Sequence, residues 1–127
     1  MRLNHVMLTV RDLDASAAFY GRWFGYGRRV PDPSRLLLLT GPAGGLLALG
    51  AGTPPDGARD AVHLGFEAAS PAEVRAARAR FREEGVEEVE WQESRPTRVQ
   101  VRDPDGYRVD LYAWEDGPPL DPGPARG

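Results

Sequence analysis

Apolar and β-branched residues cluster in short runs along this chain, and two longer segments between them have helical character. The first run, LNHVMLTV at residues 3–10, is typical of a strand. Asp12 is a suitable N-cap for the segment LDASAAFYGRWF, and Gly25 is a suitable left-handed C-cap. The chain therefore begins with a predicted strand and helix.

Three short strands are predicted next, because turn sequences rich in Gly and Pro separate short apolar runs. They are expected around residues 26–30, 35–40 and 46–51. The segment that follows, GAGTPPDGARD, is dense in Gly and Pro and is interpreted as a linker. This completes one βαβββ unit.

The same order of elements recurs after the linker. Residues 61–67 predict a strand, and the SPAE segment at residues 70–73 is a capping box with proline at the first helical position. A helix is expected to run to Gly85, followed by strands near residues 86–92, 97–102 and 107–114, the last two joined by the DPDG turn. A repeat of this kind, at a spacing of about sixty residues, indicates two related supersecondary units.

The predicted fold class is α+β, with two βαβββ modules in one domain at residues 1–114. The modules are expected at about 1–52 and 60–114, with the linker at about 50–60. The segment 115–127 is expected to be a mobile tail, because its Pro- and Gly-rich composition cannot build a core.

Charge and hydropathy exclude several classes of partner. The chain has 127 residues and a formal net charge of -3, so it lacks the basic surface that nucleic acids require. No apolar run is long enough for a membrane span, and the first residues lack the apolar core of a signal peptide. We expect a cytoplasmic protein that binds neither nucleic acid nor membrane.

The residue types that are missing narrow the chemistry further. There is no cysteine, and all 16 basic residues are arginine, which excludes thiolate ligands and Schiff-base lysines. Only two histidines are present, so any imidazole chemistry involves His5, His63 or both.

Three segments resemble one known family: NHVMLTVRDLDASAAFYGRWFG, AVHLGFE and VRDPDGYRVDLYAW. They are similar to the vicinal oxygen chelate superfamily, which includes glyoxalase I, extradiol dioxygenases, fosfomycin resistance enzymes and bleomycin-binding proteins. The resemblance covers most of residues 3–114. It implies paired βαβββ modules around a cavity, with metal ligands on the first and last strands of a module.

Carried over by position, the resemblance assigns metal-ligand positions to His5, His63 and Asp110. Asp110 stands where the family usually has glutamate, and a fourth carboxylate position falls on Ala48, which argues against glyoxalase I activity. Two imidazoles and one carboxylate suit a divalent ion such as Fe²⁺, Mn²⁺, Ni²⁺ or Zn²⁺. Strand alternation independently predicts that these three side chains point away from the helix-facing side of their strands.

The second half also contains candidates for substrate contact. Arg98 and Gln100 share one face of their predicted strand with Arg102, and Arg98 is a candidate clamp for a carboxylate, phosphonate or enolate. An edge arginine in solvent is the alternative. Glu67 is the candidate general base and Tyr112 the candidate oxyanion donor. Trp114 is a candidate cavity-wall residue.

Two functions remain open at this point. The first is a small metal-dependent enzyme, of lyase, isomerase, dioxygenase or transferase type, acting on a small molecule with vicinal oxygens. The alternative is a metal-free protein of the bleomycin resistance type that sequesters a small molecule. In either case we expect a homodimer in which modules of two chains pair, because one module forms only half a cavity.

Overall fold

The computed structural model describes residues 1–32 and 34–115. Most of the predicted tail, 116–127, therefore lies outside the described residues. The chain forms two compact units, which are treated separately below. Unit 1 comprises Met1–His63 and Arg102–Arg108, and the described part of unit 2 comprises Leu64–Val101 and Val109–Glu115.

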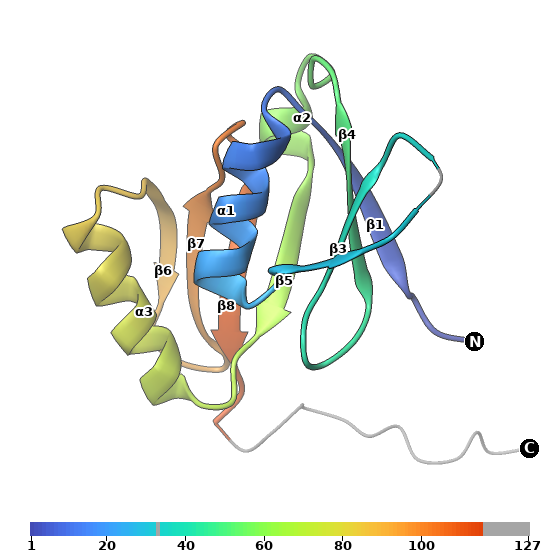
Figure 1. Cartoon of the computed structure of the whole chain (residues 1–127). Helices are drawn as coiled ribbons and strands as arrows, with labels where there is room; N and C mark the ends of the chain where they lie inside the picture. The colour runs from blue at the N-terminus through green and yellow to red at the C-terminus, as the bar shows by residue number, and fades with distance from the viewer. Residues whose placement is uncertain (33, 116–127) are drawn as a thin grey trace, which may run out of the picture. The chain divides into compact units, whose positions relative to one another are not determined.

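Unit 1 contains a four-stranded sheet and one long helix (Figure 1). Its sheet has the strand order β1-β4-β3-β2, with β1 parallel to β4 and the other pairs antiparallel. The elements are β1 (His5–Val10), α1 (Leu13–Phe24), β2 (Arg28–Val30), β3 (Leu37–Thr40) and β4 (Leu46–Ala51).

Helix α1 begins and ends where the capping residues predict. The Asp12 side chain accepts a hydrogen bond from the backbone N–H of Ala15 at 3.0 Å. At the other end Gly25 has φ 75°, a left-handed conformation that glycine adopts without a steric penalty. These caps satisfy backbone groups that the helix itself leaves without partners.

Burial alternates at the end of β1, whereas β4 is buried continuously from Leu47 to Gly50. Leu8, Val10, Leu47 and Leu49 are buried. Burial of these side chains is the main stabilising contribution to unit 1, since each is worth about 1.5–3 kcal/mol relative to full exposure.

The segment predicted as a linker contains a short helix, α2 (Ala58–Ala61), and the next strand starts at His63 rather than at residue 61. Gly57 precedes α2 with φ 78°. The Gly- and Pro-rich composition correctly indicated a connection between strands but gave no sign of this single helical turn.

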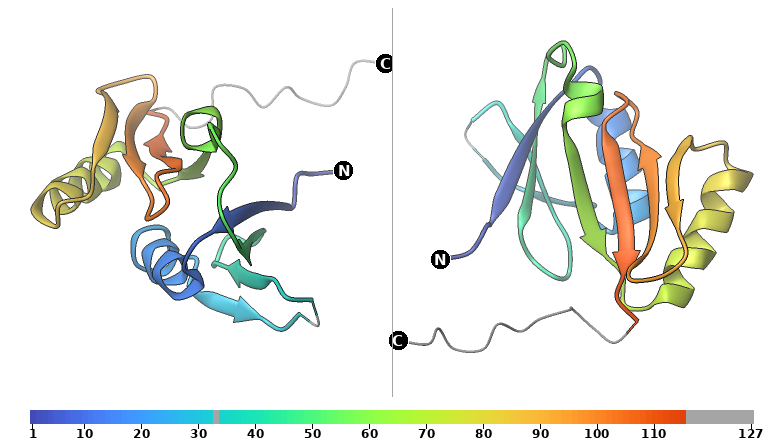
Figure 2. Two further views of the ribbon diagram at one scale, coloured as in Figure 1. Left: turned by 90° about the horizontal axis from the view of Figure 1, so that it is seen from above. Right: turned by 180° about the vertical axis from the view of Figure 1, so that it is seen from behind.

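Unit 2 contains most of the second sheet and the second long helix, which lies along one face of the sheet (Figures 1 and 2). The strand order is β5-β8-β7-β6. The elements are β5 (His63–Glu67), α3 (Pro71–Glu83), β6 (Glu88–Gln92), β7 (Thr97–Arg102) and β8 (Arg108–Ala113). Two four-stranded sheets, each following the order strand, helix and three strands, confirm the predicted α+β fold of two βαβββ modules.

Helix α3 is capped at Ser70, whose hydroxyl accepts from the N–H of Glu73 at 3.2 Å. Three arginines of this helix, Arg75, Arg78 and Arg82, pair with glutamates outside the helix, Glu93 and Glu88. Arg78 Nε donates to Glu88 at 2.7 Å, and Arg78 Cζ lies 4.2 Å from the ring centre of Trp91. Arg78 therefore links the helix to β6.

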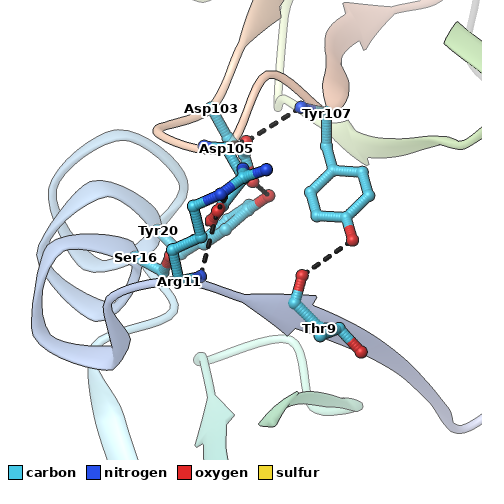
Figure 3. A network of polar contacts seen from close by, with 7 residues as sticks. All are labelled: Thr9, Arg11, Ser16, Tyr20, Asp103, Asp105 and Tyr107. Carbon is cyan, nitrogen blue, oxygen red and sulfur yellow. Dashed lines mark hydrogen bonds and ion pairs between the residues drawn. The ribbon is translucent and has the colours of Figure 1, made fainter. Parts of the chain in front are cut away.

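The DPDG turn is part of unit 1, where it is held by a backbone carbonyl of β1, by Arg11 between β1 and α1, and by side chains of α1 (Figure 3). The Tyr20 hydroxyl donates to Asp103 Oδ2 at 2.7 Å, and the Tyr107 hydroxyl donates to the carbonyl of Thr9 at 2.7 Å. Asp105 accepts from the Arg11 backbone N–H at 3.0 Å. The tip of the β7–β8 hairpin is thus tied to the first strand and first helix of the chain.

Candidate functional site

The sheet of unit 2 has one apolar and one polar face, as the alternation along β7 and β8 predicts. On the helix side the buried residues are Val99, Val101, Val109 and Leu111. Arg102 and Arg108, at the ends of these strands that belong to unit 1, share the other face with four residues of unit 2: Arg98, Gln100, Asp110 and Tyr112. We refer to these four residues, together with Glu67 and Glu90, as the polar face.

Strand β5 contributes to the polar face through Gly65 and Glu67. A Cβ atom added at Gly65 would lie 3.2 Å from the Tyr112 ring and 3.6 Å from Asp110 Cβ, so this glycine faces both side chains. Glu67 follows two positions later and shares that orientation. The absence of a side chain at Gly65 leaves space beside Asp110 and Tyr112.

Asp110 is at the centre of the polar face and is 8% exposed. One of its oxygens, Oδ1, accepts from Arg98 Nη1 at 3.1 Å and from Gln100 Nε2 at 2.9 Å. The residue predicted to bind metal and the two predicted to bind substrate are therefore directly connected. Neither residue type nor alternation indicated these cross-strand contacts.

Arg98 also forms an ion pair with Glu90, a residue that the sequence analysis did not single out. Burial lowers the pKa of Arg98, but its hydrogen bond to Glu90 and the charge of Asp110 outweigh this effect and raise the pKa overall. The guanidinium thus directs both terminal nitrogens at carboxylates of its own unit. In this arrangement it is engaged by anions of the protein and is not presented as an open clamp.

Tyr112 is suited to donate a hydrogen bond. Burial raises the pKa of its hydroxyl, and the negative charges of Glu67 and Asp110 raise it further. The phenol therefore remains protonated at neutral pH.

Gln100 is almost completely buried, at 2% exposed, yet half of its amide lacks a partner. Within residues 1–32 and 34–115, no hydrogen-bond donor reaches its carbonyl oxygen Oε1. The nitrogen of the same amide is held by Asp110. A buried carbonyl without a donor is unfavourable by about 1–3 kcal/mol.

Two further candidates lie at the ends of the site strands. Trp114 follows the last residue of β8 and is half-buried. Arg102, expected to share the face of Arg98, donates to Asp60 at 3.1 Å and to the carbonyl of Gly106 at 2.8 Å. Its guanidinium supports the hairpin tip in unit 1.

The two histidines belong to unit 1, whereas Asp110 belongs to unit 2. His5 is the exposed first residue of β1 and pairs in register with Leu46. Ala48, to which the family resemblance assigns a fourth ligand position, pairs in register with Met7 and is 2% exposed. His63 is the exposed first residue of β5.

In the described part of the chain, no three histidine, aspartate or glutamate side chains form a group that could hold a metal ion. The set of His5, His63 and Asp110 thus stays a prediction, as do the roles of Glu67, Tyr112 and Trp114. None of the described helices is both long enough and apolar enough to cross a membrane.

Comparison with known proteins agrees with this architecture. A model of the Glyoxalase/Bleomycin resistance protein/Dioxygenase superfamily matches residues 2–111. The chain belongs to this superfamily. The family resemblance seen in the strand and hairpin segments is thereby confirmed.

Solved structures of this superfamily share the fold. A glyoxalase/dioxygenase from Nostoc punctiforme is 22% identical, with a TM-score of 0.74 and coverage of 92% of this chain and 91% of the other. A glyoxalase/bleomycin resistance protein/dioxygenase from Nocardioides is 23% identical, with a TM-score of 0.69 and coverage of 95% and 89%. No curated protein matches. At these identities the superfamily relationship establishes the fold, and the reaction has to be argued from the site.

Proposed function

We propose that this protein is a small metal-dependent enzyme of its superfamily, acting on a small molecule with two adjacent oxygens. In this proposal Asp110, His5 and His63 hold one divalent ion. The observation that carries it is the fixed carboxylate of Asp110, which lies on a strand face and is held at one oxygen by two donors.

The residues suit such an ion in two respects. Two imidazoles and a carboxylate are ligands that Fe²⁺, Mn²⁺, Ni²⁺ and Zn²⁺ accept, and three protein ligands leave coordination positions for a substrate. Carboxylates that bind metals are themselves usually oriented by hydrogen bonds. Arg98 and Gln100 supply that support at Asp110 Oδ1.

The bound ion would act as a Lewis acid toward the substrate oxygens. The side chains of the chain contribute the remaining steps. Tyr112, kept protonated, would donate a hydrogen bond to a developing oxyanion. Glu67, on the same face, would accept a proton from carbon or oxygen of the substrate.

A second function is favoured by the same contacts. Because Arg98 balances the charge of Asp110, this carboxylate has a charged partner without an ion. The polar face would then bind a small molecule without chemistry, as in the bleomycin resistance type. The two proposals differ in one measurable property, which is metal uptake.

The edge of the first sheet supports the proposed homodimer. Strand β1 is one of the two edge strands of its sheet, and several apolar side chains on or beside it are exposed: Leu3 at 89%, Val6 at 40% and Met7 at 54%. Exposed apolar edge strands of this kind tend to pair with another chain. A second copy of this chain is the proposed partner.

Calorimetric titration with Mn²⁺, Ni²⁺, Zn²⁺ and, without oxygen, Fe²⁺ tests the enzyme proposal. We expect about one ion per chain in the wild type. Uptake should be lost in His63→Ala and in Asp110→Ala but retained in Glu93→Ala, which removes an exposed carboxylate paired with Arg75. No uptake of any of the four ions by the wild type would contradict the metal-dependent proposal and leave the binding function.

A further inference from the structure

The unsatisfied oxygen of Gln100 indicates what kind of group the site recognises. Gln100 lies on β7 with its side chain on the polar face, and only 2% of the residue is exposed. Its Oε1 has no donor in the described part of the chain. A buried acceptor of this kind requires a donor from a molecule outside the chain, either a ligand or a trapped water.

The orientation of the amide is determined by its neighbour. Nε2 donates to Asp110 Oδ1 at 2.9 Å. Turning the amide over would place Oε1 against a carboxylate oxygen, two acceptors facing each other without a proton between them. The hydrogen bond to Asp110 therefore fixes the Gln100 amide with Nε2 towards the carboxylate and leaves Oε1 as an acceptor.

The arginines on this face of the sheet already have carboxylate partners. Arg98 pairs with Glu90 and Asp110, and Arg102 and Arg108 pair with Asp60. An anionic ligand would have to compete with these carboxylates. A ligand with a hydroxyl or N–H group would meet an acceptor that lacks a donor.

We infer that the ligand of this site is an uncharged or cationic small molecule that donates a hydrogen bond to Gln100 Oε1, from a hydroxyl or an N–H group. Gln100 is thus a specificity-determining residue, and anions are disfavoured. This deepens the proposed function, because it states the polarity of the molecule that the same site would take. It rests on the polar face being the binding site and not on the presence of a metal.

Three probes of one shape test the inference. 2-Hydroxyacetophenone, 2-methoxyacetophenone and phenylglyoxylate all have a phenyl ring and two adjacent oxygens. The first carries a hydroxyl donor, the second has that donor methylated, and the third is an anion without a donor. Binding is followed by the ¹⁵N–¹H resonances of the Gln100 side-chain amide in the protein as purified, assigned by their loss in Gln100→Met.

We expect 2-hydroxyacetophenone to shift the Gln100 resonances and to bind about tenfold or more tightly than either other probe. In Gln100→Met this preference should disappear. Gln92→Met is the matched control, since Gln92 lies on β6 and its Nε2 donates hydrogen bonds to the backbone carbonyls of Ser94 and Pro96. The preference should persist in that variant.

Equal binding of the hydroxy and methoxy probes would overturn the inference, as would tighter binding of phenylglyoxylate or no binding of any probe at the solubility limit. A trapped water alone would appear as a Gln100 amide insensitive to all three. Metal uptake without donor preference refutes this inference and leaves the enzyme proposal standing. Donor preference without metal uptake would support this inference and contradict the metal-dependent enzyme proposal.

Discussion

Arg98 Nη1 lies 3.1 Å from Asp110 Oδ1, which joins a residue predicted to bind substrate to one predicted to bind metal. Both side chains are largely buried, with 22% and 11% of the side chains exposed. In such surroundings neither charge is well solvated, so each depends on the other. Removing either partner would therefore leave a largely buried charge without compensation.

Arg98→Met should destabilise the protein by about 1–2 kcal/mol, because Asp110 and Glu90 then lose their shared cation. Urea denaturation followed by far-UV circular dichroism measures the change. The matched control is Arg75→Met, which breaks an ion pair between more exposed groups, Arg75 and Glu93, at 3.1 Å. Pairs of that kind contribute about 0–1 kcal/mol. An equal decrease in the unfolding free energy of the two variants would show that the Arg98 ion pairs contribute no more to stability than the exposed pair of Arg75 and Glu93.

A second stability prediction concerns the contact between Tyr20 and the tip of the β7–β8 hairpin. Tyr20 is fully buried and its hydroxyl donates to Asp103 at 2.7 Å. Tyr20→Phe deletes only this hydroxyl and leaves Asp103 Oδ2 without its donor, so unfolding free energy should fall by about 1–3 kcal/mol. Tyr26→Phe is the control, because the Tyr26 hydroxyl donates to the carbonyl of Gly44 in an exposed position. A smaller loss in Tyr20→Phe than in Tyr26→Phe would contradict the role assigned to this contact.

Asp103 should also give stability a specific dependence on pH. Burial raises its pKa above the ordinary value of 3.8, more than its hydrogen bonds to Tyr20 and the turn lower it. The folded state therefore binds a proton that the unfolded state has released, in the window between 3.8 and the folded pKa. Through this window the contribution of Asp103 to stability rises as pH falls.

Asp103→Asn removes that titration. The unfolding free energy of the wild type relative to this variant should decrease as pH is raised from about 4 towards neutrality. Urea denaturation of both proteins across that range measures the difference. A constant difference would show that the pKa of Asp103 is the same in the folded and unfolded states, and a difference that grows with pH would show a pKa lowered by folding; either result would contradict the prediction.

Much of this arrangement could be predicted from local sequence. Asp12, Gly25 and Ser70 marked helix ends through interactions within one turn, and alternation placed Gln100 and Asp110 on one side of the sheet. Register between strands was not accessible in this way, since it depends on pairing across the sheet. The contact of Arg98 with Asp110 was therefore missed. Glu90 was missed for a related reason, because a register irregularity lies between Glu88 and Glu90 in their pairing with β7.

The fourth ligand position predicted at Ala48 can be tested by adding a carboxylate there. Ala48 is almost completely buried, so Ala48→Glu should destabilise the metal-free protein. If the fourth ligand position of the family is correctly assigned, the new carboxylate should tighten Mn²⁺ binding and the ion should restore stability. Ala48→Gln, similar in size but uncharged, should tighten binding less. Unchanged Mn²⁺ affinity in Ala48→Glu would show that Ala48 does not occupy that position.

The last prediction concerns assembly. If modules of two chains pair, His5 of one chain would complete a site with His63 and Asp110 of the other. Two variants that each bind no metal, His5→Ala and Asp110→Ala, should then regenerate binding when mixed. After subunit exchange, one site of each heterodimer has all three ligands, whereas the other lacks both His5 and Asp110.

Calorimetry of the exchanged mixture should therefore recover about one ion per heterodimer, with Mn²⁺ as the probe. His5→Ala mixed with His5→Ala prepared in the same way is the control and should bind none. Sedimentation at micromolar concentration should show a dimer for the wild type. A monomer, or a mixed sample that exchanges subunits and still binds no metal, would mean that the ligands of each site come from a single chain, and that the exposed edge of β1 serves another contact.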